Sequence, residues 1–228
     1  MNGAFLVDIL LWFIVLLFSL SFHESAHALV SDRCGDNTAR LLGRISLNPL
    51  VHIDPLGTVI FPLLSAVTGI PLFGWAKPTP VNPLNWRDKD RANILVSAAG
   101  PISNLILAVL FFGILKGLLM GGIVFENPLA RQYFDIFTGE GVIEPIAKIL
   151  WIAVFTNVAL AVFNLFPIPP LDGSHIVESL LPPEAARGYE QISRFPFSII
   201  LFYGLLALGV FSAVLTPVIT FVLRLLMM

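Results

Sequence analysis

The stretch FLVDILLWFIVLLFSLSFHESAHALV, residues 5–30, decides the fold of this chain. Residues 9–20 are apolar apart from Ser19, so the run predicts a helix that crosses a bilayer with some tilt. Two imidazoles and a carboxylate follow inside the same run, at His23, Glu24 and His27. Because hydrocarbon tolerates ionisable side chains poorly, their presence there indicates a functional site.

The spacing of these three residues predicts a metal site. His23 and His27 are four residues apart, which places both imidazoles on one face of a helix. In the pattern H-E-x-x-H two histidines hold a zinc ion and the glutamate activates its water. The alternative is a polar network of the same side chains that only joins helices.

Composition places the chain in the membrane. Of its 228 residues, 57% are hydrophobic and 12% are charged, whereas soluble domains carry about 25% charged residues. No polar stretch is long enough for a separate soluble domain, so we expect one integral membrane domain over residues 1–228. No basic stripe or aromatic platform indicates nucleic-acid binding, and membrane lipid is the expected surrounding.

We predict an all-α polytopic membrane protein. Its core is three transmembrane helices that carry the metal site, accompanied by a re-entrant or β-hairpin segment and a further C-terminal span. The expected spans are residues 4–30, 92–120, 143–166 and 197–223, the last with a bend at Pro217. Alternating polar and apolar residues at 43–49 predict a short strand.

Residues 56–73 are apolar but interrupted by prolines and glycine, which favours a re-entrant segment over a thin full span. The proline-rich sequence FGWAKPTPVNP, residues 73–83, excludes helix and central strand. It reads as an extended edge that either pairs with a peptide or anchors a loop at the membrane surface. Its candidate substrate-binding residues are Gly74, Trp75, Ala76 and Lys77.

Polar residues in the later spans extend the site. Asn104 needs partners in an apolar helix; it either joins helices or belongs to the active-site shell, and we count it with the substrate-binding candidates. The third expected span ends in NLFPIPPLDG, residues 164–173, where prolines stiffen the chain before Asp172. Asp172 is the favoured third ligand over His175, and His52 is expected to be a structural loop histidine paired with Asp54.

The distribution of lysine and arginine predicts the orientation. If residues 56–73 are re-entrant, seven basic residues fall in connectors on one side and one, Arg131, on the other. The positive-inside rule then puts the metal end of the first helix toward the cytoplasm.

With His23-Glu24-x-x-His27 and Asn164-x-x-Pro167-x-Pro169-Pro170-Leu171-Asp172-Gly173, the chain resembles the site-2 protease family of intramembrane zinc metalloproteases. Phe73-Gly74-Trp75-Ala76-Lys77-Pro78 and Gly100-Pro101-x-x-Asn104 resemble a compact prokaryotic branch that lacks PDZ and CBS domains. The resemblance covers most of the chain.

This resemblance implies one Zn²⁺ per chain, with His23, His27 and Asp172 as ligands and Glu24 as general base. It implies that Asn164 binds the substrate carbonyl or its oxyanion. The implied substrates are transmembrane segments of membrane proteins, cut either to release tethered regulators or to clear signal-peptide remnants. The sequence does not indicate an oligomeric state.

Two other functions share these residues. A membrane metal transporter uses similar ligands, but it needs further polar residues along a path through the bilayer. A proteolytically inactive binder of the same fold is the second alternative, and Glu24, which zinc binding does not require, speaks against it.

Overall fold

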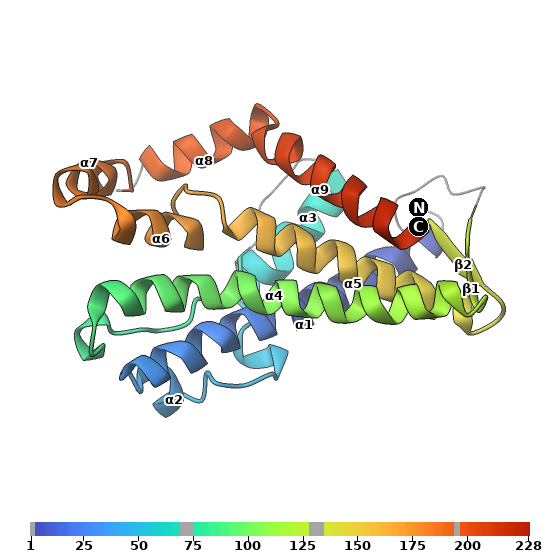
Figure 1. The fold of residues 1–228 in the computed structure, drawn as a ribbon, viewed down its shortest axis with the longest axis horizontal. Coiled ribbons are helices and arrows are strands. Elements are labelled where there is room, and N and C mark those ends of the chain that lie inside the picture. The colour runs from blue at the N-terminus through green and yellow to red at the C-terminus, as the bar shows by residue number, and fades with distance from the viewer. Residues whose placement is uncertain (1–2, 69–74, 128–134, 194–196) are drawn as a thin grey trace.

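The computed structural model describes residues 3–68, 75–127, 135–193 and 197–228, which fold mainly into helices (Figure 1). The first half contains α1 Gly3–Cys34, α2 Thr38–Leu41, η1 Pro49–Val51, η2 Pro55–Ile60, α3 Phe61–Thr68, η3 Pro83–Asn85 and α4 Lys89–Met120. The second half contains β1 Val124–Glu126, β2 Phe137–Gly139, α5 Ile143–Asn164, α6 Asp172–Leu180, α7 Pro183–Ser193, α8 Phe197–Ala207 and α9 Val210–Met227.

The core is formed by α1, α4 and α5, which pack side by side (Figure 1). Among the described residues, four helices are long and apolar enough to cross a membrane: α1, α4, α5 and α9. The chain is therefore a multi-pass membrane protein with a three-helix core, which confirms the predicted fold class.

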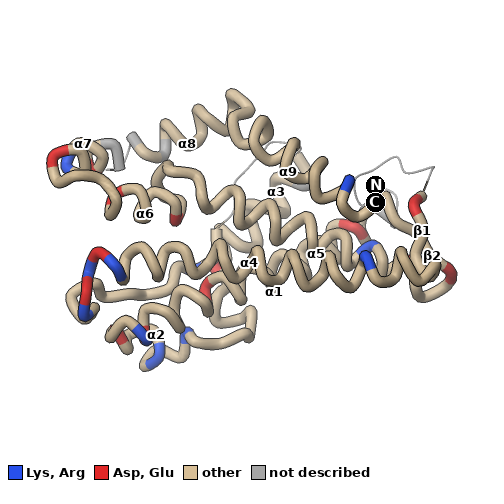
Figure 2. The backbone as a smooth tube through the Cα atoms, in the orientation of Figure 1, with Lys and Arg blue, Asp and Glu red and all other residues tan. Residues whose placement is uncertain are grey.

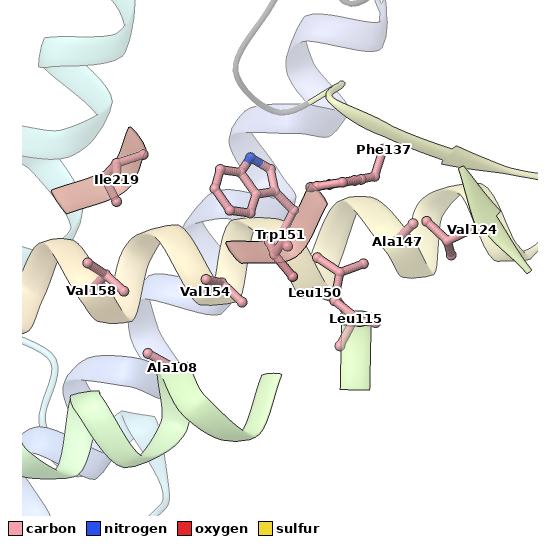
Figure 3. Packing of buried hydrophobic residues seen from close by; sticks show 11 residues of the cluster. Ala108, Leu115, Val124, Phe137, Ala147, Leu150, Trp151, Val154, Val158 and Ile219 are labelled. Atoms are coloured by element: carbon pink, nitrogen blue, oxygen red, sulfur yellow. The ribbon is translucent and has the colours of Figure 1, made fainter. Parts of the chain in front are cut away.

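A hydrophobic cluster around Trp151 holds α5 against its neighbours (Figure 3). The Trp151 side chain is fully buried and makes an edge-to-face contact with Phe137, with ring centroids 5.7 Å apart. Leu115 of α4 and Ile219 of α9 belong to the same cluster. The antiparallel β1–β2 hairpin, in a region expected to be a connector, thus closes the end of the bundle that lies away from the metal-binding motif.

Residues 55–68 form η2 and α3, and the chain that resumes at Trp75 lies beside the start of η2. The Trp75 N–H donates to the Gly57 carbonyl at 3.2 Å, and the Lys77 N–H donates to the His52 carbonyl at 2.9 Å. Both ends of the segment therefore lie together, as a re-entrant segment requires. The intervening residues 69–74, including Gly74, lie outside the described part of the chain.

Two expected elements differ in the structure. Residues 43–48 form neither helix nor strand, and Asn48 instead caps η1 by accepting a hydrogen bond from the Leu50 N–H at 3.1 Å. An alternating pattern without a partner strand cannot form a ladder, so the predicted strand is wrong. The expected single run 197–223 is divided into α8 and α9, because Gly209 adopts a left-handed conformation with φ +73°.

The buried carboxylate of Asp36 joins three parts of the chain near the C-terminal end of α1. It accepts hydrogen bonds from Thr38 at the start of α2, from the Asn82 N–H at 2.7 Å and from Asn85 Nδ2 at 3.0 Å. Although burial alone raises the pKa of Asp36, these hydrogen bonds outweigh it and lower the pKa to about 2. Asp36 thereby fixes the end of the proline-rich segment against α1.

We expect Asp36→Asn to destabilise the protein at pH 7, because the new amide NH₂ faces donors and leaves buried groups unpaired, at about 1–3 kcal/mol. The lowered pKa of Asp36 means that its contribution is present above about pH 4 and is lost as the pH falls toward 2. Thermal unfolding in detergent between pH 7 and pH 3 measures both effects. Equal melting temperatures for the variant and the wild type at pH 7 would contradict this account.

Candidate metal centre

The two histidines of α1 point at each other. Their Nε2 atoms are 3.1 Å apart, and their rings stand edge to face with centroids 4.6 Å apart. Both side chains are buried, with His23 4% and His27 8% exposed. The four-residue spacing on a continuous helix produces this arrangement, as the sequence predicts.

Asp172, the first residue of α6, completes the cluster. One carboxylate oxygen, Oδ2, lies 3.1 Å from His23 Nε2 and 3.4 Å from His27 Nε2. The neighbours of Asp172 hold it there: Leu171 is buried among aromatic side chains, and Gly173 lies so close to α5 that an added Cβ would be 2.3 Å from the Leu165 carbonyl oxygen. Ligand atoms of the three residues all lie within 4.8 Å of one another.

Hydrogen bonds on the far side of each ring set the tautomers. His23 Nδ1 lies 2.7 Å from Asn104 Oδ1, and His27 Nδ1 lies 2.7 Å from the Val96 carbonyl oxygen. Since both partners are acceptors, each Nδ1 carries the proton and donates it. Each Nε2 therefore presents a lone pair toward Asp172.

The orientation of the Asn104 amide is itself fixed. Its Nδ2 donates to Asn157 Oδ1 at 2.8 Å and to the Ser19 carbonyl at 3.2 Å, so its oxygen must face His23. Asn157 in turn donates to Ser19 Oγ and to the Ala153 carbonyl. This relay connects all three core helices to one imidazole.

The donor set fits a zinc ion. Two imidazole nitrogens and one carboxylate oxygen are the ligand types of catalytic zinc sites, which use three protein ligands and an open position. Three electron-pair donors at this distance repel one another unless a cation lies among them, and Asp172 Oδ2 is buried without a hydrogen-bond donor. Gly100 of α4 leaves room for an ion beside the two imidazoles. A Cβ added at this position would lie 2.4 Å from His27 Nε2 and 2.6 Å from His23 Nε2, so any larger residue would fill that room.

Glu24 lies beside the cluster and is held by a residue that the sequence did not reveal. Its Oε2 accepts hydrogen bonds from the Thr79 N–H at 2.9 Å and from Thr79 Oγ1 at 2.7 Å. Thr79 belongs to the proline-rich segment, 55 positions further along the chain, so no local pattern links the two. The Glu24 side chain lines the same cavity as the three ligands.

The proline-rich segment is extended, as expected, but several of its backbone groups already have partners. Trp75 pairs with η2 through its N–H to Gly57 and its carbonyl to Thr58 Oγ1. The Lys77 carbonyl accepts from an Arg44 guanidinium nitrogen at 2.6 Å. Of the candidate residues described here, Trp75, Ala76 and Lys77, Ala76 is the one whose N–H and carbonyl make no hydrogen bond within the described chain.

Some of the remaining candidate residues line a cavity, and one is buried between the helices. A cavity of about 1460 Å³ is lined by the metal cluster together with Asn164, Trp75 and Ala76. Asn164 donates from Nδ2 to the Leu160 carbonyl at 2.9 Å. Asn104 has no exposed surface, so it does not contact a substrate in this structure; its expected substrate-binding role is replaced by support of His23.

The two other histidines lie outside the cluster. His52 is buried, and its Nε2 donates to the Ser46 carbonyl at 2.8 Å; burial lowers its pKa. Its expected pairing with Asp54 is wrong, because Asp54 caps η2 through the N–H groups of Leu56 and Gly57. His175 lies on α6 with its Nδ1 3.8 Å from Glu178, and it is not part of the metal cluster.

Sequence comparisons agree with this geometry. A family model described as peptidase family M50 matches residues 11–203. The Bacillus subtilis protein named "Putative zinc metalloprotease YwhC" is 39% identical over 209 residues, which cover 90% of this chain and 83% of that protein. The Mycolicibacterium smegmatis protein named "Putative zinc metalloprotease Rip2" is 31% identical over 204 residues, which cover 87% of this chain and 66% of that protein. No solved structure matches the chain significantly.

We expect Gly100→Ala to weaken zinc binding while the helices stay folded, because the added Cβ occupies the space between the two imidazoles. Overpacking costs about 1–3 kcal/mol, which corresponds to about 5- to 150-fold in zinc affinity. Gly113→Ala on the same helix is the matched control, since nothing lies within 4 Å of its added Cβ. Competition with a zinc chelator measures the affinity, and equal values for both variants would contradict the proposed space.

Proposed function

Because this chain belongs to peptidase family M50, a family of zinc metalloproteases, we propose that it hydrolyses peptide bonds inside transmembrane segments of other membrane proteins. One observation carries the proposal: His23, His27 and Glu24 lie on a helix long and apolar enough to span a membrane. A protease that cuts soluble peptides does not need its catalytic residues within a membrane-spanning helix. The whole chain, residues 1–228, acts as one membrane-embedded unit in this proposal.

In the proposed reaction His23, His27 and Asp172 hold the zinc ion. The ion supplies Lewis acidity, which makes a water more acidic and polarises the scissile carbonyl. Glu24 accepts a proton from the attacking water as the water oxygen bonds to the carbonyl carbon. The carbon–nitrogen bond then breaks, and Glu24 returns the proton to the leaving amine. The products are a carboxylic acid and an amine, which become a carboxylate and an ammonium group when the acid gives its proton to the amine.

Asn164 is the proposed donor to the developing oxyanion. It lies at the C-terminal end of α5, lines the cavity with Glu24, and uses its Nδ2 in a hydrogen bond to its own helix. An amide group so placed needs only a side-chain rotation to donate to a substrate oxygen. One well-placed donor of this kind contributes about 3 kcal/mol to a transition state.

The substrate must be extended where it is cut, because the carbonyl groups of an intact helix are already hydrogen-bonded internally. The free N–H and carbonyl of Ala76 offer one pair of backbone hydrogen bonds to such an extended segment. Ala76 lines the cavity that contains the metal cluster. Backbone hydrogen bonds between Ala76 and a peptide would hold that peptide in a fixed register beside the zinc site.

The charge distribution supports an active site toward the cytoplasm. Basic residues gather at the end of the molecule that carries α2 and the start of α4 (Figure 2). At the other end, Lys148 is paired with Asp8 and Asp135, and Lys116 donates to a backbone carbonyl. Release of tethered regulators or clearance of signal-peptide remnants are the roles that suit this orientation.

We expect Glu24→Gln to abolish cleavage of a fluorescent single-span substrate in proteoliposomes while its zinc content stays near one per chain. Asp172→Ala removes a ligand, so it should lose both activity and zinc. Zinc is measured by mass spectrometry on the same samples. Equal cleavage by wild type and Glu24→Gln would refute the proposed function.

We expect Ala76→Pro to reduce cleavage at least about 10-fold, because proline removes an N–H that has no hydrogen-bond partner among the described residues. Ala76→Ser is the control that keeps the N–H. Gly74, another candidate substrate-binding residue of this segment, lies outside the described residues. Steady-state cleavage and zinc content are compared for both variants, and equal activities would exclude backbone pairing at Ala76.

A further inference from the structure

We propose that Thr79 is the positioning residue for Glu24 and that it connects the peptide-pairing edge to the catalytic base as one rigid unit. This inference rests on the proposed proteolytic function. Within the described chain, Thr79 makes no hydrogen bond to the metal ligands. Its contacts go to the side chain and to the backbone of Glu24.

Two donors from one residue converge on one oxygen of Glu24. The Thr79 N–H and hydroxyl lie 2.9 Å and 2.7 Å from Oε2, and the hydroxyl lies 3.0 Å from the Glu24 carbonyl. Oε1 has no donor within the described chain and belongs to the side chain that lines the cavity. The carboxylate is thus held by one oxygen, which leaves the other to exchange a proton with water.

The segment that carries Thr79 is itself stiff. Prolines at 78 and 80 flank Thr79, fix their own φ angles and restrict Thr79 to extended conformations. Arg44 donates to the carbonyls of Lys77 and Pro78 at 2.6 Å and 3.2 Å. The next bond along the chain runs from Asn82 to Asp36. The donors of Thr79 therefore stay aimed at Glu24 without help from a substrate.

Ala76 lies three residues before Thr79 on the same extended segment. A peptide that pairs with Ala76 is consequently placed at a fixed distance from the oxygen that Thr79 leaves free. Loss of the Thr79 hydroxyl should leave peptide pairing intact but let the carboxylate rotate. A purely structural role, in which Thr79 only attaches the segment to α1, would instead weaken substrate binding.

Thr58 provides the matched control for this distinction. Its hydroxyl donates to the Trp75 carbonyl at 2.8 Å and accepts from the Asp54 N–H at 2.9 Å. It therefore supports the same segment and makes no hydrogen bond to Glu24 within the described chain. Thr58→Val removes a hydroxyl of the same kind from a buried position. This variant should raise KM with little change in kcat.

The test compares Thr79→Val, Thr79→Ser and Thr58→Val with a membrane-protein substrate in proteoliposomes. We expect Thr79→Val to lower kcat about 10- to 100-fold, as for a misplaced catalytic group, with KM and zinc affinity within about two-fold of wild type. Thr79→Ser, which keeps the hydroxyl, should recover most of kcat. In metal-free protein, Glu24→Ala should speed hydrogen exchange of the Thr79 amide.

The inference is overturned if Thr79→Val keeps the wild-type kcat, if it raises KM as Thr58→Val does, or if Thr79→Ser is equally impaired. Unchanged exchange at Thr79 in Glu24→Ala would also overturn it. In each of these cases Glu24→Gln remains inactive and the proposed proteolysis stands. Cleavage by Glu24→Gln at the wild-type rate would remove the proteolytic function, and this inference with it.

Discussion

Three electron-pair donors meet in an apolar helix bundle, and a bound cation among them relieves their mutual repulsion. The Nε2 atoms of His23 and His27 and an oxygen of Asp172 lie 3.1–3.4 Å apart. In a low-dielectric surrounding, unpaired polar groups at this distance cost far more than in water. Each core helix contributes to this cluster. Helix α1 carries the imidazoles, α4 leaves space beside them and accepts hydrogen bonds from their Nδ1–H groups, and α5 leads into the loop that positions Asp172.

The same constraint explains why polar residues persist inside otherwise hydrophobic helices. Asn104 and Asn157 are fully buried, yet apart from one bond from Asn157 to the Ala153 carbonyl of its own helix, their described hydrogen bonds orient His23 or join the helices around it. A fully satisfied buried network of this kind is rigid. Rigidity matters here because a catalytic zinc site must keep its open position accessible while its ligands stay in place.

Local patterns in the sequence predicted the parts of the site that depend on local geometry. The spacing of His23 and His27 translates directly into one helix face, and the prolines before Asp172 indicate a chain that holds one position. Thr79, Val96 and Gly100 were missed as site residues because their roles arise from contacts between segments far apart in the sequence. Asn104 was assigned to the site, but its direction, behind His23 and not toward a substrate, depends on helix rotation.

The misjudged elements have the same origin. Alternation at 43–49 suggested a strand, but a strand needs a partner, and Asn48 is better used as a helix cap there. The run 197–223 had the composition of one span, and the break at Gly209 follows from its left-handed backbone. Hydropathy describes which residues lie in the membrane, whereas the direction of each helix is set by single residues and by packing.

X-ray absorption spectroscopy at the zinc edge tests the central claim most directly. The account predicts one zinc per chain with two imidazole nitrogens and oxygen ligands at about 2.0–2.2 Å, and loss of this signal in Asp172→Ala. A spectrum without an imidazole pair, or one left unchanged by Asp172→Ala, would contradict the account.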